Sequence, residues 1–180
     1  RSRLRCTRVP AISIVIPCRL GTKRVVAGVE LTLLEHCLQS IRRSLSPQDA
    51  PSPESPQIQI VLVLNHDDDL SQARELIEHY GLEGLAVCDE FGFDFARKCN
   101  LGARHANGDI LVFLNDDTDM QTVDWTKDVI SLLVEDDVAC VGGMLQNADR
   151  SVQSCGDNVG RNSAVHYAPH PSADNVGDAM

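Results

Sequence analysis

Apolar runs recur along the chain, each too short for a helix and without the polar alternation of a half-exposed strand. Such runs are typical of strands that are buried on both faces, as in a parallel sheet. They predict strands at residues 11–16, 59–64, 85–88, 110–114 and 138–141. The run at 110–114 is apolar throughout, and we expect both of its faces to be covered. Pro17 ends the first strand because proline cannot donate to a sheet ladder.

The segments between these runs carry apolar residues at the spacing of amphipathic helices. Helices are predicted at residues 29–45, at 73–80 with a stop at Gly81, within 91–108, and after an N-cap at Asp124. The expected inner faces of the last two helices are Phe95, Cys99, Gly102, Ala103 and Ala106, and Trp125, Val129, Leu132 and Leu133. Strands that alternate with helices predict an α/β fold: a three-layer sandwich with a mostly parallel central sheet and helices on both faces.

The remaining segments are predicted loops and one hairpin. Residues 18–28 are rich in glycine and basic side chains, and residues 46–56 are rich in proline. Residues 144–153 are a predicted hairpin that turns at residues 147–150. Beyond Gly156 the periodicity disappears, and a loop or an unfinished element is expected.

The composition fits one soluble globular domain, because 180 residues with 43% hydrophobic content can build a core. No apolar run approaches the roughly 20 residues of a membrane span, and the basic start lacks the apolar centre of a signal peptide. No transmembrane segment and a cytoplasmic location are therefore expected. The net charge of −10 and the few aromatic residues argue against a nucleic-acid partner.

The 7 cysteines are widely spread and never arranged as Cys-x-x-Cys. Their odd number does not suit a complete set of intramolecular pairs. We interpret them as reduced and mostly buried side chains rather than as a zinc site or a disulfide framework.

A cluster of oxygen ligands follows the strand predicted at 110–114. It consists of Asn115, Asp116, Asp117, Thr118 and Asp119. Open α/β sheets bind their ligands at the carboxyl ends of strands, where this cluster is expected. Its carboxylates repel one another, and a divalent cation such as Mg²⁺ or Mn²⁺ relieves that repulsion. The alternative is a solvated acidic turn that caps the next helix.

Polar residues also follow the first two strands. Arg19, with Lys23 and Arg24, could meet phosphates, although a solvated loop explains these residues equally well. After the second strand, residues 65–69 read Asn-His-Asp-Asp-Asp, where Asp69 could simply cap the following helix.

Two polar residues of the third predicted helix, Arg97 and Asn100, lie three positions apart and so share one side of it. We expect that side to point toward the ligand-bearing edge of the sheet. No Gly-x-Gly-x-x-Gly follows the first strand, where Pro17-Cys-Arg-Leu-Gly21 stands instead. This disfavours the dinucleotide-binding version of the fold.

Several segments together resemble a known family. They are residues 12–17, 34–41, 93–102, 106–119 (Ala-Asn-Gly-Asp-Ile-Leu-Val-Phe-Leu-Asn-Asp-Asp-Thr-Asp), Trp125 and 138–156. In this order they are similar to the family 2 glycosyltransferases of the GT-A fold, particularly the bacterial rhamnosyltransferase-like branch. Residues 97–119 carry the most specific part of the resemblance.

The resemblance implies a metal-assisted, inverting glycosyltransferase of cell-wall or polysaccharide biosynthesis. It would transfer a sugar from a nucleoside diphosphate sugar to a hydroxyl of an acceptor, with glycan, lipid and protein all open. The nucleotide-binding positions carried over from the family are Pro17, Arg19, Asn65, Asp67, Arg97, Asn100 and Asp116. Asp116 and Asp117 stand at the family's metal motif, with Mg²⁺ or Mn²⁺ as the expected cofactor.

The chain departs from the family pattern at its strand ends. Asn115 replaces the first Asp of the Asp-x-Asp motif, and Asn65 would have to replace an Asp after a shift of one residue. The carboxylate base that inverting transferases need is expected beyond Met180, so no catalytic residue is predicted. The expected organisation is an N-terminal extension (1–10), a nucleotide-sugar-binding domain (11–156), and a loop or truncated start of the acceptor region (157–180).

Two other functions fit parts of the sequence. A truncated or non-catalytic nucleotide-sugar-binding domain would keep the donor pocket without the acceptor half. A sugar nucleotidyltransferase is the second, since Pro17-x-Arg19-x-x-Thr22-x-Arg24 resembles the start of the sugar-acid cytidylyltransferases. The lysine expected shortly afterwards is missing, and residues 97–119 fit the glycosyltransferases better.

Overall fold

The computed structural model describes residues 8–26, 28–45, 55–91, 94–160 and 163–166. Most of the expected N-terminal extension, much of the proline-rich loop and the tail after His166 lie outside the described residues. The chain divides into two compact units, Arg1–Ile130 and Ser131–Met180. The predicted parallel sheet belongs to the first unit.

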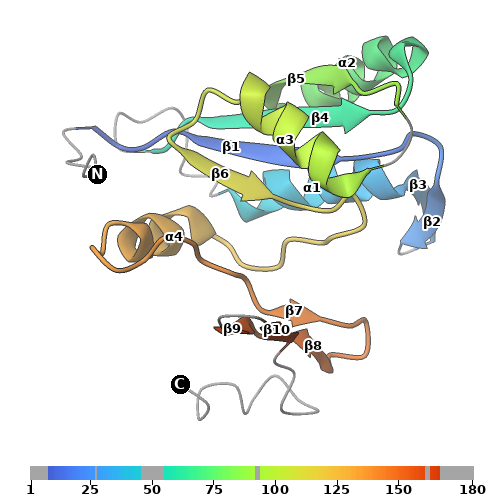
Figure 1. Ribbon diagram of the computed structural model, residues 1–180. Coiled ribbons are helices and arrows are strands. Elements are labelled where there is room, and N and C mark those ends of the chain that lie inside the picture. The colour runs from blue at the N-terminus through green and yellow to red at the C-terminus, as the bar shows by residue number, and fades with distance from the viewer. Residues whose placement is uncertain (1–7, 27, 46–54, 92–93, 161–162, 167–180) are drawn as a thin grey trace. The chain divides into compact units, whose positions relative to one another are not determined.

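Four parallel strands form this sheet: β1 (Ile12–Pro17), β4 (Ile58–Leu64), β5 (Glu83–Cys88) and β6 (Ile110–Phe113). Their order is β5-β4-β1-β6, so β1 lies in the middle between β4 and β6 (Figure 1). The four strands are those that the apolar runs predict, and the sheet is parallel as expected.

Three helices cover the sheet: α1 (Leu33–Ser44), α2 (Leu70–His79) and α3 (Phe95–His105). Figure 1 shows α3 on one face and α1 and α2 on the other. This is the predicted three-layer α/β sandwich. The connecting helices lie on different faces because the chain first moves from β1 to β4 and β5, and then returns across β1 to β6. Right-handed connections that run in opposite directions along a sheet place their helices on opposite faces.

The core lies on both faces of the two inner strands. Side chains of β1 and β4 are fully buried from Ile12 to Ile16 and from Ile60 to Leu64. The expectation of two covered faces is wrong for β6, where Leu111 and Phe113 are 41% and 50% exposed. Among the described residues β6 pairs only with β1, so it is an edge strand with one open side.

Two predictions before the first helix are wrong. Residues predicted as loop and helix start form a hairpin of β2 (Lys23–Val26) and β3 (Val29–Thr32). The helix begins only at Leu33, because Thr32 is its N-cap and forms a capping box. The Thr32 hydroxyl accepts from the Glu35 N–H (3.1 Å), while the Glu35 carboxylate accepts from the Thr32 N–H (2.6 Å).

The third helix lies close to the sheet, as its small residues predict. A Cβ added to Gly102 would overlap Val15 Cγ1 and come within 3.0 Å of Val63 Cγ2. The predicted inner face is only partly right, because Phe95 is 46% exposed whereas Lys98 is fully buried. The close approach at Gly102 brings the neighbouring turn, which contains Lys98, against the sheet.

The helix α4 (Trp125–Leu133) begins directly after Asp124, and Trp125 is buried as predicted. The predicted N-cap is wrong, because the buried Oδ1 of Asp124 has no hydrogen-bond partner among the described residues. Leu132, expected inside, is exposed. Residues 138–141 are not a strand, because the structure pairs no strand with them and so short a run is not stable alone.

In the second unit, the predicted hairpin is present as β7 (Leu145–Gln146) and β8 (Val152–Ser154). A further antiparallel pair, β9 (Asp157–Gly160) and β10 (Ser163–His166), lies where the sequence shows no periodicity. None of the described helices has the length and apolar character that crossing a membrane requires.

Candidate functional site

The acidic loop after β6 meets the end of β1. The backbone N–H of Arg19, two residues after β1, donates to Asp116 Oδ2 over 3.1 Å. The chain leaves β1 toward β4 on one side and later returns to β6 on the other side of β1, so the strand order reverses between β1 and β6 and their ends flank a topological switch point. Open α/β sheets commonly bind their ligands at such points.

Burial raises the pKa of the Asp116 carboxyl, and the neighbouring Asp117 carboxylate raises it further. The hydrogen bond from the Arg19 backbone works in the opposite direction. Asp116 is half-buried and Asp117 is exposed. A half-buried carboxylate with an exposed carboxylate beside it is a suitable donor set for a hard divalent cation.

The rest of the acidic loop is tied to α1. Asp119 forms an ion pair with Arg43 (3.0 Å), and His36 Nε2 lies 3.2 Å from its other carboxylate oxygen. The Met120 N–H donates to Ser40 Oγ (2.9 Å), and the Cys37 thiol donates to the Asn115 carbonyl (3.6 Å). Asp119 therefore holds the loop, and the carboxylates of Asp116 and Asp117 remain for a cation.

A cavity of about 250 Å³ lies beside Asp119 and is lined by Arg43, Ser44, Asp119, Met120, Gln121 and Val123.

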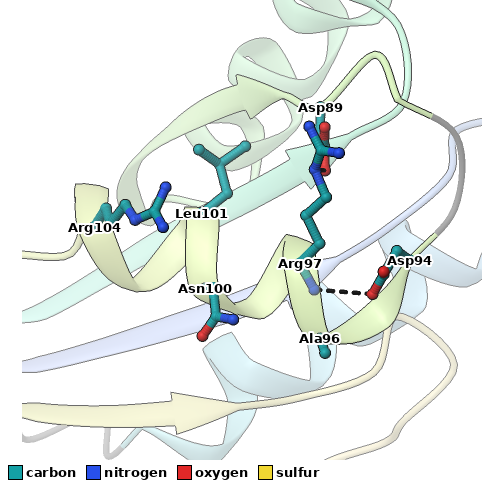
Figure 2. A pocket seen from close by; sticks show the side chains of 7 residues that line it. All are labelled: Asp89, Asp94, Ala96, Arg97, Asn100, Leu101 and Arg104. Atoms are coloured by element: carbon teal, nitrogen blue, oxygen red, sulfur yellow. Dashed lines mark hydrogen bonds and ion pairs between the residues drawn. The ribbon is translucent and has the colours of Figure 1, made fainter.

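A second cavity, of about 480 Å³, lies along α3 and the end of β5 (Figure 2). Arg97 points from the helix toward Asp89, with 3.0 Å between Arg97 Nε and Asp89 Oδ2, and its guanidinium lies 4.1 Å from the centre of the Phe91 ring. Asn100 lines the same cavity, together with Asp94, Ala96, Leu101 and Arg104. The predicted neighbours Arg97 and Asn100 thus share a cavity.

Asp89 is a site residue that the sequence reasoning missed. Its side chain is buried, and its N–H donates to the Leu64 carbonyl (3.0 Å). The signal was present, because Asp89 directly follows β5 just as Asn65 follows β4 and Asn115 follows the strand at 110–114. A rule that selects polar residues at strand ends would have found it.

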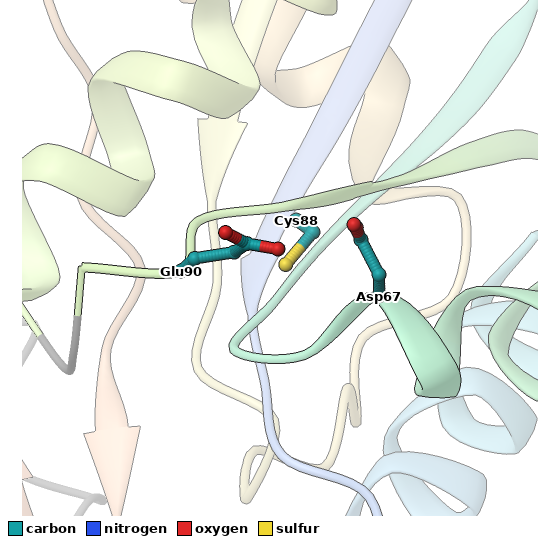
Figure 3. A group of neighbouring side chains, drawn as sticks. All are labelled: Asp67, Cys88 and Glu90. Atoms are coloured by element: carbon teal, nitrogen blue, oxygen red, sulfur yellow. The ribbon is translucent and has the colours of Figure 1, made fainter.

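Asp67, at the start of the short helix η1 (Asp67–Asp69), lies with Cys88 and Glu90 in a group whose ligand atoms are within 4.8 Å of one another (Figure 3). This group could hold a metal ion, although the sequence predicts the metal at Asp116 and Asp117. Burial, followed by the Asp67 and Glu90 carboxylates, raises the pKa of the Cys88 thiol to about 11. Nearby in sequence, Asn65 Oδ1 is buried and has no hydrogen-bond partner among the described residues.

Lys98 was also missed. Its side chain is fully buried, and its Nζ donates to the Val63 carbonyl over 3.0 Å. Burial lowers the pKa of its ammonium. Its only sequence signal is its position four residues before Gly102, which places it on the face that packs on the sheet.

The predicted residues therefore fall into three groups. Pro17, buried at the end of β1, and Arg19 lie with Asp116 and Asp117. Asn65 directly follows β4, with Asp67 beside the end of β5, and Arg97 and Asn100 line the cavity along α3. Among the described side chains no hydrogen bond or ion pair joins Arg97 to Asp116, so these groups are neighbours of one sheet edge rather than one contact network.

The cysteines among the described residues are Cys18, Cys37, Cys88, Cys99, Cys140 and Cys155, and all are reduced. Cys18 and Cys37 are buried, as the sequence predicts. Cys140 is exposed, and the other three are half-buried, so the expectation that most are buried is wrong for the part of the chain that the structure describes.

The parallel sheet between two layers of helices, with acidic residues after its strands, defines the class of the fold: an α/β domain consistent with the GT-A type. A model of the family described as glycosyl transferase family 2 matches residues 13–163, and the chain belongs to this family. No curated protein matches it. Family membership supports a glycosyltransferase with a nucleotide-sugar donor and an acceptor, in a family that commonly uses a divalent metal.

Proposed function

We propose that the chain transfers a sugar from a nucleoside diphosphate sugar to an acceptor hydroxyl, with inversion and with the help of Mg²⁺ or Mn²⁺. The observation that carries this proposal is the contact between the Arg19 N–H and Asp116 Oδ2 at the switch point of a family 2 fold. It joins the strand end that would border the nucleotide to the strand end that carries the metal motif. The rhamnosyltransferase-like branch and polysaccharide synthesis in the cytoplasm are parts of the same proposal.

Asp116 and Asp117 would hold the cation. Their carboxylates are the hard oxygen ligands that Mg²⁺ and Mn²⁺ prefer, and the raised pKa of Asp116 indicates that its charge lacks a full partner in the protein. A bound cation supplies charge stabilisation for the departing diphosphate. The chain itself orients Asp116 through the Arg19 N–H, and holds the loop through Asp119 and α1.

The nucleotide would lie along the ends of β1, β4 and β5. The buried Asn65 Oδ1, which has no partner among the described residues, is available to accept a hydrogen bond from a base or ribose, with Asp67 beside it. The Arg97 side chain remains 46% exposed in its pair with Asp89, which leaves donors on its outer edge for the donor molecule. Pro17 and Asn100 complete the proposed set.

Titration calorimetry tests the donor site directly. UDP-, GDP- and dTDP-sugars are titrated into the protein with and without Mn²⁺, and at least one should bind in a metal-dependent way. Asp117→Asn should abolish the metal dependence and leave the fold intact. Asp119→Asn is the matched control. It removes a carboxylate from the same loop, but this carboxylate already contacts His36 and Arg43 of α1. We expect it to lower stability and keep metal-dependent binding.

Unchanged metal-dependent affinity in Asp117→Asn would contradict the proposed metal site. Cys88→Ser provides the second comparison, since it alters the group of Asp67, Cys88 and Glu90 instead. If only Cys88→Ser loses metal binding, the cation belongs at the end of β5.

An assay of sugar transfer and of donor hydrolysis separates the transferase from a binding domain. Release of the nucleoside diphosphate supports catalysis by the chain. Tight binding without turnover favours the non-catalytic alternative, since the proposal assigns no carboxylate base to any of the described residues. Pyrophosphate release from a nucleoside triphosphate and a sugar phosphate would instead indicate the nucleotidyltransferase.

A further inference from the structure

Lys98 is a buried cation that forms no ion pair with any residue that the structure describes. Its side chain is fully buried, and the Val63 carbonyl is its hydrogen-bond acceptor. Among the side chains that the structure describes, the nearby carboxylates have other partners: Asp89 pairs with Arg97, and Asp116 accepts from the Arg19 backbone. Burying a charge without a counter-ion is strongly unfavourable, so a fold that keeps such a group commonly uses it.

The ammonium lies where the ends of the strands meet. The Val63 carbonyl, which accepts from Lys98 Nζ, also accepts from the Cys18 N–H over 3.0 Å. Cys18 directly precedes Arg19, whose N–H contacts Asp116. Lys98 is therefore joined by two hydrogen bonds to the β1 end of the proposed donor site.

The charge of Lys98 faces groups from the other strands as well. Besides Val63 in β4 and Cys18 after β1, its electrostatic neighbours are Cys88 and Asp89 at the end of β5 and Asp116 after β6. Every strand of the four-stranded sheet thus contributes a group at its carboxyl end. The positive charge is central to the edge at which the ligand would bind.

We propose that Lys98 is a positioning residue that acts as a fixed cation beneath the donor site, attracting the donor diphosphate and weakening the binding of the divalent metal alone. The inference rests on the proposed function, because it assumes that both ligands bind at this edge. One buried positive charge attracts a dianionic ligand and repels a cationic one, so it changes their affinities in opposite directions. For a divalent ligand roughly 8–10 Å away at a water-exposed site, where the effective dielectric constant approaches that of water, such a charge changes an affinity by about three- to tenfold.

A merely structural role gives a different expectation. If Lys98 only ties the Val63 carbonyl to α3, its loss should loosen the strand ends and weaken both ligands together. A neutral side chain that can still donate to Val63 would then restore binding. The sign of the effect on each ligand therefore separates the two roles.

Three substitutions in the full chain make the test. Lys98→Met removes the charge and keeps an apolar chain of similar length, and Lys98→Gln removes the charge and keeps an N–H donor. Lys127→Met is the matched control, because Lys127 is exposed on α4. Mn²⁺ binding is followed by the electron paramagnetic resonance of the free ion. Binding of UDP, GDP and dTDP is measured by calorimetry both in Mn²⁺, where the proposed site binds them more tightly, and in EDTA, where the charge of Lys98 acts without the metal. Thermal unfolding is recorded for each protein.

Both Lys98 variants should bind the nucleoside diphosphates about three- to tenfold more weakly and Mn²⁺ about three- to tenfold more tightly than the wild type. Lys127→Met should change neither affinity. Replacing a buried charge by an apolar group is often neutral or stabilising, so Lys98→Met should unfold cooperatively at an unchanged or higher temperature.

Parallel weakening of both ligands, wild-type binding by Lys98→Gln, or loss of folding in Lys98→Met would each assign Lys98 a structural role and overturn the inference. Unchanged affinities in both variants would overturn it as well. In all these cases the proposed donor site stands, because the wild type binds. A wild type that binds neither Mn²⁺ nor any of the three nucleotides refutes the proposed function, and the inference with it.

Discussion

At the scale of single residues, Asp116 combines the proposed chemistry with a cost in stability. Its folded-state pKa is raised, first by burial and then by Asp117, so the folded protein binds the proton more tightly than the unfolded chain does. The free energy of unfolding therefore falls as the pH rises through the range between the unfolded and folded pKa values, and stays lower above it.

Asp116→Asn should for this reason be more stable than the wild type at pH 7 in metal-free buffer. Asn is neutral at every pH, and its carbonyl oxygen can still accept from the Arg19 N–H. The difference between the two proteins should shrink as the pH is lowered through the folded pKa of Asp116. Urea unfolding from pH 4 to pH 8 measures it, and a variant that is less stable at pH 7 would contradict the argument.

The cysteines give a second prediction at this scale. Burial, with a further contribution from Asp116, raises the pKa of Cys18 to about 12, and the same causes raise the pKa of Cys37. Since the thiolate is the reactive form, both should resist alkylation at pH 8, while the exposed Cys140 reacts quickly. Iodoacetamide labelling followed by peptide mass spectrometry measures the rates.

All cysteines should react at similar rates once the protein is unfolded in guanidinium, which is the control. Equal labelling of Cys18 and Cys140 in the native protein would show that the end of β1 opens readily.

The residues that could be predicted from sequence are those that directly follow apolar strands. Asp116, Asp67 and Arg19 all lie at the expected edge of the sheet because a parallel strand fixes where its carboxyl end lies. Lys98 could not be found in this way. Charged side chains are seldom buried, and only the close approach of α3 to β1 covers this one.

At the scale of elements, the apolar runs predict the four parallel strands because the inner strands are covered on both faces. They fail for β6, since a run of apolar residues does not reveal whether a further strand lies beside it. The start of α1 was readable in principle from Thr32-x-x-Glu35, a capping box that is stronger evidence than apolar spacing.

The packing of α3 on the sheet depends on Gly102, and Gly102→Ala should test it. Alanine favours a helix over glycine by about 1 kcal/mol, but the added Cβ would overlap Val15 Cγ1. Overpacking of a core costs about 1–3 kcal/mol, so the net effect should be a loss of stability. Chemical unfolding measures the change, with Gly143→Ala as the control, because a Cβ there meets no atom within 4 Å. A stabilised Gly102→Ala protein would mean that α3 is not held this close.

At the scale of the whole molecule, the strand order was not readable from the sequence. The order β5-β4-β1-β6 brings the loops after β1 and β6 together although they are separated by about a hundred residues of chain, and local patterns carry no information on that pairing. The structure also divides into two compact units, Arg1–Ile130 and Ser131–Met180, while the donor-binding domain expected over residues 11–156 stays a prediction. The division has a consequence for function.

The first unit contains the complete four-stranded sheet and every residue proposed for the donor and the metal. A chain shortened to residues 1–137 keeps α4 whole and should therefore unfold cooperatively. It should bind Mn²⁺ and a nucleotide sugar with affinities within about threefold of those of the full chain. This limit corresponds to a difference in binding free energy of less than about 0.7 kcal/mol. Transfer to an acceptor should be lost, because acceptor surfaces in this proposal are built from later residues. Calorimetry on both chains, with Asp117→Asn in the shortened chain as the negative control, measures the binding. A shortened chain that folds but no longer binds would show that residues after Asp137 complete the donor site, and the proposed set of ligands would then have to extend into the second unit.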